Sequence, residues 1–425
     1  MKRWAVVLLL ALLLAGHAAA ETGISVMSCV EADGEYGDLV NAPINAFEEL
    51  LDQWRQAHAE VTVSYQTRPI GEMSILARMD HLPDVFILDA KSGRIYAREG
   101  LLCDVTEALT QSEYIDAYRL DSLTPYVYYG YIAAFPALAK YCQTVIYDRD
   151  VFEEFPSTWD ALCGFDARGR GYEGIIAFGN GGGTPAVSAL LSPVLLNGDG
   201  VAWLMSMVNG EKAHSFRDAA FVAAVDRVKA MLDAPVFLKS ALRESSEAAI
   251  AAFASQKTPA ILVSGDDVYR TLETVKAKAP ELYDRLGFAA LPGGPAAAGF
   301  RYGLFVNAKL KEDPEKLRLC EDLCVWLTGR RYADAVASAC GRQGFTAADP
   351  AAVEAFRSEC GDETLKRLAE YTDGADTCMD LNQYLYHAVW SGFGGNITKK
   401  DPDAPNAEII ANGMQDVYEQ YYLDR

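Results

Sequence analysis

An α/β fold in two lobes is the architecture that the sequence predicts, on three observations. Apolar, strand-like segments alternate with amphipathic, helix-like segments from Ile24 onward, a rhythm typical of α/β folds. The same alternation resumes at Thr144, which implies a second α/β unit. The stretch Leu291–Gly299, rich in proline, glycine and alanine, interrupts it just before another strand, so we expect the chain to cross between lobes there. At ~100–200 residues per domain, a chain of 425 residues has room for both units.

Four segments predict the first lobe. Apolar residues at helical spacing predict an amphipathic helix that includes Ile44 and Trp54, and alternation predicts a half-buried strand over Val61–Tyr65. Strands are also expected at Ile24–Cys29 and at Asp84–Asp89. The latter is a nearly continuous apolar run closed by an acid, as in a central parallel strand.

Asp89 is the first candidate contact for a ligand. It closes a predicted parallel strand, and in open α/β sheets ligands bind beyond the carboxyl ends of the strands. An equally acceptable interpretation is that Asp89 is the N-cap of the following helix.

The second lobe and the returning segment follow the same pattern. Strands are predicted at Thr144–Tyr147, Gly174–Phe178, Pro259–Val263 and Phe300–Val306, and a helix at Ala219–Leu232. A further helix has Asp313 as N-cap, Pro314 in its first turn and Gly329 as its stop. This helix carries no chemistry, and we expect it to be scaffold.

Composition and the N-terminus indicate an exported protein. Lys2 and Arg3 precede an apolar run that ends in Ala18–Ala20, so residues 1–20 read as a secretory signal peptide, with an uncleaved anchor as the alternative. The 59 acidic residues outnumber 38 basic ones, for a net charge of -21. So acidic a chain is a poor partner for nucleic acid or an anionic membrane.

Marks of catalysis or metal binding are weak. The histidines are scattered without metal-site spacing, no GxSxG motif occurs, and the nine cysteines form no CxxC pair. Disulfides among the last five cysteines are compatible with export, although buried thiols are the better interpretation of Cys320 and Cys324. We therefore expect no catalytic residue, no cofactor and no metal.

Two polar segments remain as ligand candidates. The run Gly179–Thr184 lacks a P-loop lysine and the dinucleotide-binding spacing, so we interpret it as a tight connection beside a ligand cleft, with Thr184 as a contact. The pair Asp266–Asp267 follows a strand and is open to three interpretations: a helix cap, a ligand contact or a glycosidase carboxylate.

Taken together, these segments resemble the extracellular solute-binding proteins of ABC importers, in the branch that includes the maltose-binding protein. The segment Leu82–Asp89 and the residues up to Thr106 match the family's first-lobe pattern. Ala134–Pro136, leading to Tyr147–Phe152, resembles its crossing into the second lobe, and Phe253–Gly265 with Gly299–Val306 resembles its return.

The resemblance implies a two-lobe periplasmic-binding-protein fold of type II, with a hinge and a ligand cleft between the lobes. It places the first lobe at residues 21–140 and 299–340, and the second at 141–298 and 341–425. By position it also implies ligand contacts. These are Asp89 at its strand end, Tyr141 beside the hinge, Arg301 and Tyr302 after the returning crossover, and an aromatic platform from Tyr384, Tyr386 and Trp390. A core role for Trp390 is the alternative.

The function implied is capture of a small solute, most often a sugar, by hinge closure and its delivery to a membrane permease of separate chains. The expected protein is a periplasmic or extracellular soluble monomer and not an enzyme. Asp267 stands where many relatives have a tryptophan, which leaves room for a polyamine or another small polar solute. A secreted glycoside hydrolase is the alternative from a different class.

Overall fold

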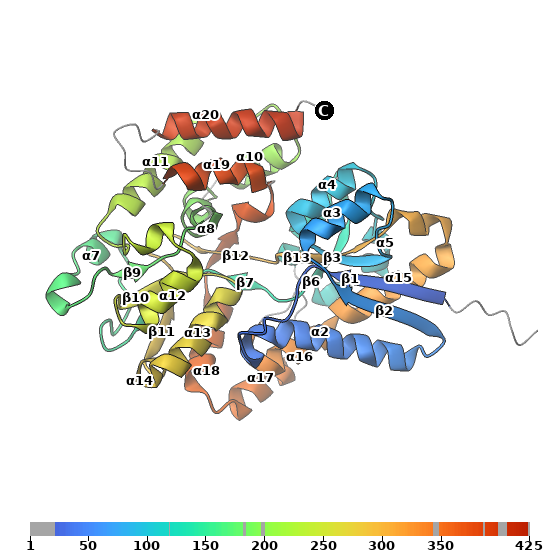
Figure 1. Ribbon diagram of the computed structural model, residues 1–425, viewed down its shortest axis with the longest axis horizontal. Helices are drawn as coiled ribbons and strands as arrows, with labels where there is room; N and C mark the ends of the chain where they lie inside the picture. The colour runs from blue at the N-terminus through green and yellow to red at the C-terminus, as the bar shows by residue number, and fades with distance from the viewer. Residues whose placement is uncertain are drawn as a thin grey trace, which may run out of the picture.

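Two mixed β-sheets, joined by a small third one, organise the molecule (Figure 1). The computed structural model describes residues 22–118, 120–181, 184–196, 200–342, 348–385, 387–397 and 406–423. The predicted signal peptide lies outside these residues. Among them, no helix combines the length and the apolar composition that crossing a membrane requires.

The first sheet has the strand order β2-β1-β3-β13-β6. Its strands are β1 (Thr22–Ser28), β2 (Val61–Thr67), β3 (Val85–Asp89), β6 (Ala134–Ala137) and β13 (Tyr302–Val306). The first three are parallel, and β13 runs antiparallel to both β3 and β6. The predicted strands of this lobe are thereby confirmed, within one or two residues at their ends.

Helices cover both faces of this sheet, and this explains the apolar run of β3. Val85 and Ile87 belong to one buried cluster, whereas Phe86 and Leu88 belong to another on the opposite face. A strand buried on both faces has no polar side to alternate with. The helices are α2 (Asp38–Ala57), α3 (Ile70–Arg78), α4 (Ala90–Arg98), α5 (Thr106–Gln111), α15 (Pro314–Thr328) and α16 (Arg330–Cys340).

The second sheet has the order β11-β8-β10-β9. Its strands are β8 (Thr144–Asp148), β9 (Ile176–Ala177), β10 (Ala260–Val263) and β11 (Leu286–Ala289). The strand predicted over Gly174–Phe178 is shorter in the structure, because only two of its residues pair in parallel with β10.

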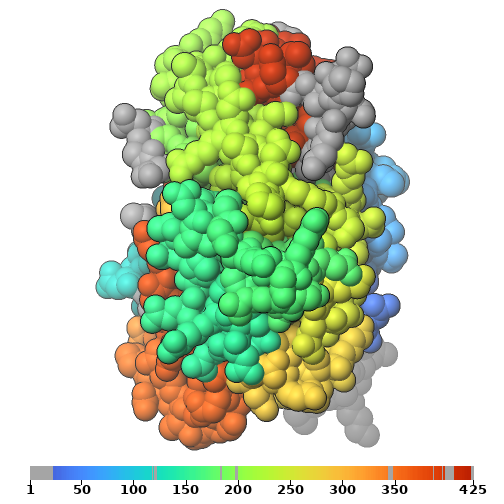
Figure 2. Space-filling model, turned by 90° about the vertical axis from the view of Figure 1, so that its left-hand side faces the viewer, coloured from blue at the N-terminus to red at the C-terminus, as the bar shows by residue number. Residues whose placement is uncertain are grey.

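Several helices belong to the second lobe. They are α7 (Trp159–Cys163), α10 (Gly200–Val208), α11 (Ala219–Asp233), α12 (Ser246–Ala254), α13 (Asp266–Lys278), α14 (Pro280–Tyr283), α17 (Pro350–Glu359), α18 (Glu363–Gly374), α19 (His387–Ile397) and α20 (Ala407–Tyr418). Helix α17 among them packs against α16. Figure 2 looks onto this lobe, with the green segment around α7 in the middle and the orange α17 and α18 at the lower end.

A three-stranded sheet of order β14-β12-β7 lies between the lobes. It is made of β7 (Tyr141–Cys142), β12 (Ala296–Gly299) and β14 (Thr377–Met379). The chain passes through β7 from the first sheet to the second and returns through β12. A third crossing joins α16 to α17. The predicted lobe boundaries at 140/141, 298/299 and 340/341 fall within these crossings, and the division into separately folding lobes stays a prediction.

The structure contains none of the disulfides that export would permit among the last five cysteines. All nine cysteines are free. Cys320 and Cys324 are fully buried on one face of α15, where they pack into the first-lobe core, as the interpretation of apolar thiols predicts. The permitted disulfides are therefore not present, because these thiols are used as small apolar side chains.

Candidate ligand-binding cleft

A cavity of about 460 Å³ lies between the two lobes. Ligand sites are commonly concave spaces of ~300–1,000 Å³ with a few precisely placed polar groups. Of the residues predicted as ligand contacts, these line it: Asp89, Tyr141, Thr184, Asp267, Arg301 and Tyr302. Whether they bind a ligand stays a prediction.

Asp89 lies at the carboxyl end of β3 and is at the same time the N-cap of α4. Its carboxylate accepts hydrogen bonds from the backbone N–H of Ser92 at 3.1 Å and from the Ser92 hydroxyl at 2.8 Å. The two interpretations of Asp89 in the sequence are therefore compatible, since a capping carboxylate at a strand end also faces the cavity.

Arg301 and Tyr302 enter the cavity from the chain between β12 and β13. The Arg301 carbonyl accepts from the Ala90 N–H at 3.2 Å, and Tyr302 is the register partner of Asp89. The guanidinium carbon of Arg301 lies 5.2 Å from the centroid of the Tyr302 ring. Its interaction with Tyr302 raises the pKa of Arg301, against burial, with Asp89 acting in the same direction, so the group stays a cation.

Lys91 brings a second cation to this place. Its ammonium donates to the Asn382 side-chain oxygen at 3.2 Å, which links α4 of the first lobe to the chain after β14. Burial lowers the pKa of Lys91, and the neighbouring Arg301 acts in the same direction. We call Asp89, Lys91, Arg301 and Tyr302 the central cluster.

Tyr141 anchors the hinge side of the cavity. Its hydroxyl donates to Asp380 at 2.6 Å and accepts a hydrogen bond from the Gln383 amide. Burial, with the carboxylate of Asp380 second, raises the pKa of Tyr141 well above its ordinary value. The phenol is therefore a neutral hydrogen-bonding group that connects β7 to the segment after β14.

Asp267 belongs to a charged group that joins the lobes. The Arg270 guanidinium contacts Asp267 at 3.1 Å on its own helix α13 and Asp33 at 2.8 Å in the loop between β1 and α2. Burial raises the pKa of Asp267, although hydrogen bonds from Ser246 and Arg270 oppose the rise. The helix-cap interpretation is wrong here, because Gly265 is the N-cap of α13 and no side chain caps it.

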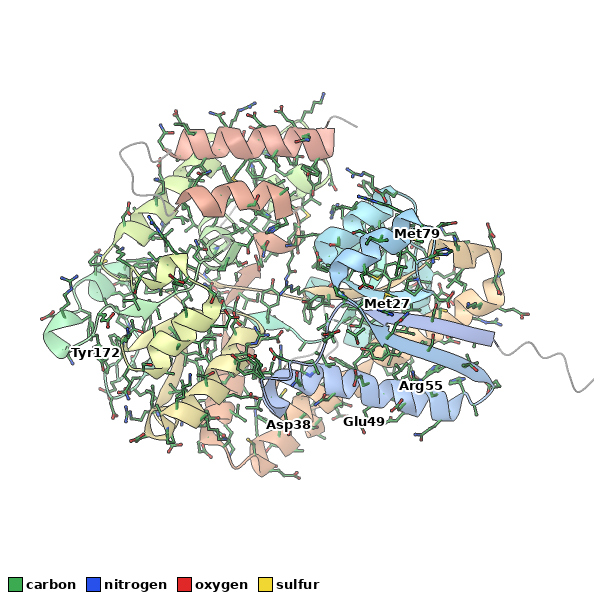
Figure 3. All side chains as sticks on the ribbon, viewed as in Figure 1. Met27, Asp38, Glu49, Arg55, Met79 and Tyr172 are labelled. Atoms are coloured by element: carbon green, nitrogen blue, oxygen red, sulfur yellow. The ribbon has the colours of Figure 1, made fainter. Side chains whose placement is uncertain are left out.

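Glu273 extends this contact to the N-terminus of α2. Its carboxylate accepts from the backbone N–H of Gly37 at 2.6 Å, of Leu39 at 3.2 Å and of Val40 at 3.4 Å. Helix α2 has Gly37 as N-cap and hence no capping side chain of its own. Figure 3 shows the labelled Asp38 at the end of α2 nearest the second lobe. We call Asp33, Asp267, Arg270 and Glu273 the edge cluster.

Arg342 makes a further contact between the lobes. It follows α16, is 5% exposed, and its guanidinium contacts the Asp266 carboxylate at 3.0 Å. Its guanidinium carbon also lies 4.4 Å from the centroid of the Tyr269 ring. Asp266 is therefore an ion-pair partner of Arg342 at the start of α13.

The glycine-rich run lies beside the cavity, as predicted. Gly179 and Thr184 line it. A Cβ on Gly179 would stand 2.4 Å from the Ser245 carbonyl oxygen, so the close approach of two backbones requires glycine there. Gly182 and Gly183 lie outside the described residues.

Tyr384 and Trp390 do not line the cavity, so their prediction as an aromatic platform is wrong for this structure. They are 3% and 0% exposed and belong to the second-lobe core. The Trp390 ring meets Phe216 edge to face, with centroids 5.9 Å apart. The alternative, a core role for Trp390, matches its position. Tyr386 lies outside the described residues.

Several residues of the site were missed from the sequence. Lys91 follows Asp89 by two positions and could have been found from the strand end, and Asp380 and Gln383 adjoin the C-terminal region already considered. Glu273 and Asp33 had no such signal, because the Glu273 contact with Gly37 joins residues 236 positions apart. No set of three or more metal-ligating side chains gathers within the described part of the chain.

One family model, that of the bacterial extracellular solute-binding proteins, matches residues 41–333. A chitin oligosaccharide binding protein superposes with a TM-score of 0.72 at 15% identity, over 94% of this chain and 98% of its own. The GacH receptor of Streptomyces glaucescens does so with a TM-score of 0.64 at 16% identity, over 95% and 99%. Maltose-bound MalE3 of T. maritima gives 0.64 at 15% identity, over 94% and 100%. No curated protein matches by sequence.

Proposed function

We propose, from the premise that this chain belongs to the bacterial extracellular solute-binding proteins, that it captures a carbohydrate in its cleft and delivers it to an ABC importer. The observation that carries the proposal is a cavity whose walls come from both lobes and from the strands that join them. A ligand that touches both walls stabilises the closed state by its differential binding to that state.

The cavity chemistry favours a sugar among small solutes. Its lining combines polar side chains, such as Asp89 and Gln143, with the rings of Tyr302 and Phe178. Hydroxyl groups of a sugar suit the former, and the apolar face of a pyranose suits an aromatic ring. In line with this, one similar structure is a chitin oligosaccharide binding protein, one is MalE3 bound to maltose, and one was solved with acarbose.

Delivery follows from the family. The closed form would be presented by an exported monomer to a membrane permease, while hydrolysis of ATP belongs to other chains. No covalent step is proposed for the cleft. The acids that a hydrolase would need as a pair, Asp266 and Asp267, are held by Arg342 and Arg270.

A thermal-shift screen of the chain without residues 1–20 tests the proposal. The panel contains mono- and oligosaccharides, polyamines, amino acids and organic acids. A ligand at ~100 times its dissociation constant adds ~2.7 kcal/mol of stability, which shifts the midpoint clearly. A shift with a sugar that is recovered intact supports carbohydrate capture. A shift with polyamines alone, or recovery of a cleaved sugar, would contradict it.

A further inference from the structure

The cleft contains an arginine, Arg301, whose side chain forms no ion pair with the described residues. Its free charge indicates which class of sugar the cleft would prefer. Arg301 lines the cavity and its side chain is exposed there. Within the described residues, Arg301 makes no side-chain ion pair or hydrogen bond, and its guanidinium carbon lies 5.2 Å from the centroid of the Tyr302 ring. A guanidinium has five N–H donors in a planar fork that fits a carboxylate.

The other arginines of the cavity are already paired. Arg270 contacts Asp33 and Asp267, and Arg342 contacts Asp266. Each of these pairs joins residues packed at the contact between the lobes. Arg301 therefore differs from them, since its charge is left for something inside the cavity.

Three acids that line the cavity together with Arg301 are also engaged. Asp89 accepts two hydrogen bonds from Ser92, Asp266 is paired with Arg342, and Asp380 accepts from Tyr141 and from the Asn382 N–H. Swinging any of them toward Arg301 would give up a hydrogen bond that it already makes. The protein offers the Arg301 guanidinium no hydrogen-bonded carboxylate among the described residues, so a ligand that supplies one gains a charge-assisted hydrogen bond.

We propose that the carbohydrate captured here carries a carboxylate, as uronic acids do, and that Arg301 is the residue that selects it. The inference rests on the proposed function, because it names a subclass of its ligand. The guanidinium would hold the carboxylate through paired N–H donors, a charge-assisted arrangement stronger than a neutral hydrogen bond. Among the described residues, the Lys91 ammonium donates to the neutral Asn382 side chain and to no carboxylate, so Lys91 adds a second positive charge on the same side.

A matched pair of ligands tests the inference without any variant. Short oligogalacturonates and their methyl esters share one skeleton and differ in charge. Calorimetric titration should give at least roughly tenfold tighter binding for the acids, with the difference shrinking as salt is raised. Glucose 6-phosphate and glucose form a second pair, which separates a carboxylate from a phosphate.

The variant Arg301→Gln should lower affinity for the acids at least roughly tenfold and bring the ratio of acid to ester affinity close to one. Arg357→Gln is the control, because Arg357 forms an exposed ion pair with Asp373 on helices α17 and α18. It should keep the preference. Thermal unfolding without ligand checks that both variants fold.

The outcomes separate the two proposals. If neutral saccharides bind as tightly as acidic ones, or if Arg301→Gln keeps the preference, the assignment to Arg301 is overturned and carbohydrate capture stands. A preference for the sugar phosphate over the uronates overturns the carboxylate. If no saccharide of any charge binds, the proposed function fails, and the inference fails with it.

Discussion

Two arginines of the cleft, Arg270 in the edge cluster and Arg301 in the central cluster, have opposite surroundings. The Arg270 side chain is 27% exposed and contacts a carboxylate from each lobe. Arg301 is exposed to the cavity and contacts the ring of Tyr302. The same residue type thus serves the contact between lobes in one place and remains available to a ligand in the other.

This difference separates two properties of a binding protein. We expect groups that pair across the lobes to favour the lobe arrangement described here whatever the ligand is, whereas groups that face the cavity act only through the ligand. We therefore expect changes in the edge cluster to alter the affinity for all ligands by the same factor, and changes in the central cluster to alter the preference among them.

Arg270→Met should have the largest effect. It leaves the carboxylates of Asp33 and Asp267, which are 24% and 23% exposed, without their shared partner. The loss of a partly buried charge contact of this kind costs ~1–2 kcal/mol, so affinity should fall roughly tenfold for every ligand. Calorimetric titration with an acidic sugar and its ester measures both constants.

The control for that variant is Arg217→Met. Arg217 pairs with Asp416 and Glu419, contacts within the second lobe that do not cross the cleft. It should leave affinity unchanged. A change in the ratio of the two ligands for Arg270→Met, with no common loss, would mean that the edge cluster also selects the ligand.

Glu273→Gln should lower ligand affinity by less than Arg270→Met does. The amide still offers an oxygen to the N–H groups of Gly37, Leu39 and Val40 but loses the negative charge at the N-terminus of α2. That interaction is worth ~0.3–1 kcal/mol, so affinity should fall about two- to fivefold. Spin labels on the two lobes should show a larger separation in the ligand-free protein.

Glu49→Gln is the matched control on the same helix. Glu49, labelled in Figure 3, is exposed and lies in the middle of α2. An equal change in lobe separation for both variants would remove the capping of α2 as the cause.

The fold was predictable from the sequence because its signals are local. The apolar run before Asp89 reflects burial on both faces of the sheet. The predicted N-cap of α15 is confirmed, because the Asp313 carboxylate accepts a hydrogen bond from the Lys316 N–H at 3.1 Å. The placement of Asp89 beside the cavity followed from its strand end, whereas that of Arg301 and Tyr302 was implied by the family resemblance.

The sequence did not predict contacts between segments that lie far apart in the chain. The capping of α2 by Glu273 leaves no trace near either residue in the sequence, since a glutamate on an amphipathic helix is ordinarily solvated. The aromatic residues near the C-terminus could not be divided between cavity and core, because a tryptophan on a helix has the same local pattern in both. Only the packing of α19 decides that Trp390 points into the core.

Asp267→Asn tests how the edge cluster depends on pH. Burial raises the pKa of Asp267 above its ordinary value of 3.8. An acid with a raised pKa contributes stability that is present below its ordinary pKa and is lost as pH rises through the folded pKa. At neutral pH the charged form therefore costs stability, and the asparagine variant should be more stable by under ~1 kcal/mol.

Urea unfolding of this variant and of the parent between pH 7 and pH 3.5 measures the difference. It should shrink toward zero at the acid end, where both side chains are neutral. Because the amide oxygen can still accept from Arg270, ligand affinity at neutral pH should change by no more than about twofold. A variant that is less stable than the parent at neutral pH would show that the ion pair outweighs the burial of Asp267.

Trp390→Phe should have the smallest effect on ligand binding, because Trp390 belongs to neither the central cluster nor the edge cluster. The indole is fully buried against Phe216, and its N–H has no hydrogen-bond partner among the described residues. Replacing it leaves a cavity in the core at a cost of ~1–3 kcal/mol but removes no polar contact. Denaturant unfolding should show this loss, while ligand affinity stays within about twofold of the parent. A large loss of affinity at unchanged stability would return Trp390 to the ligand site, because a side chain of the core acts on binding only through the fold.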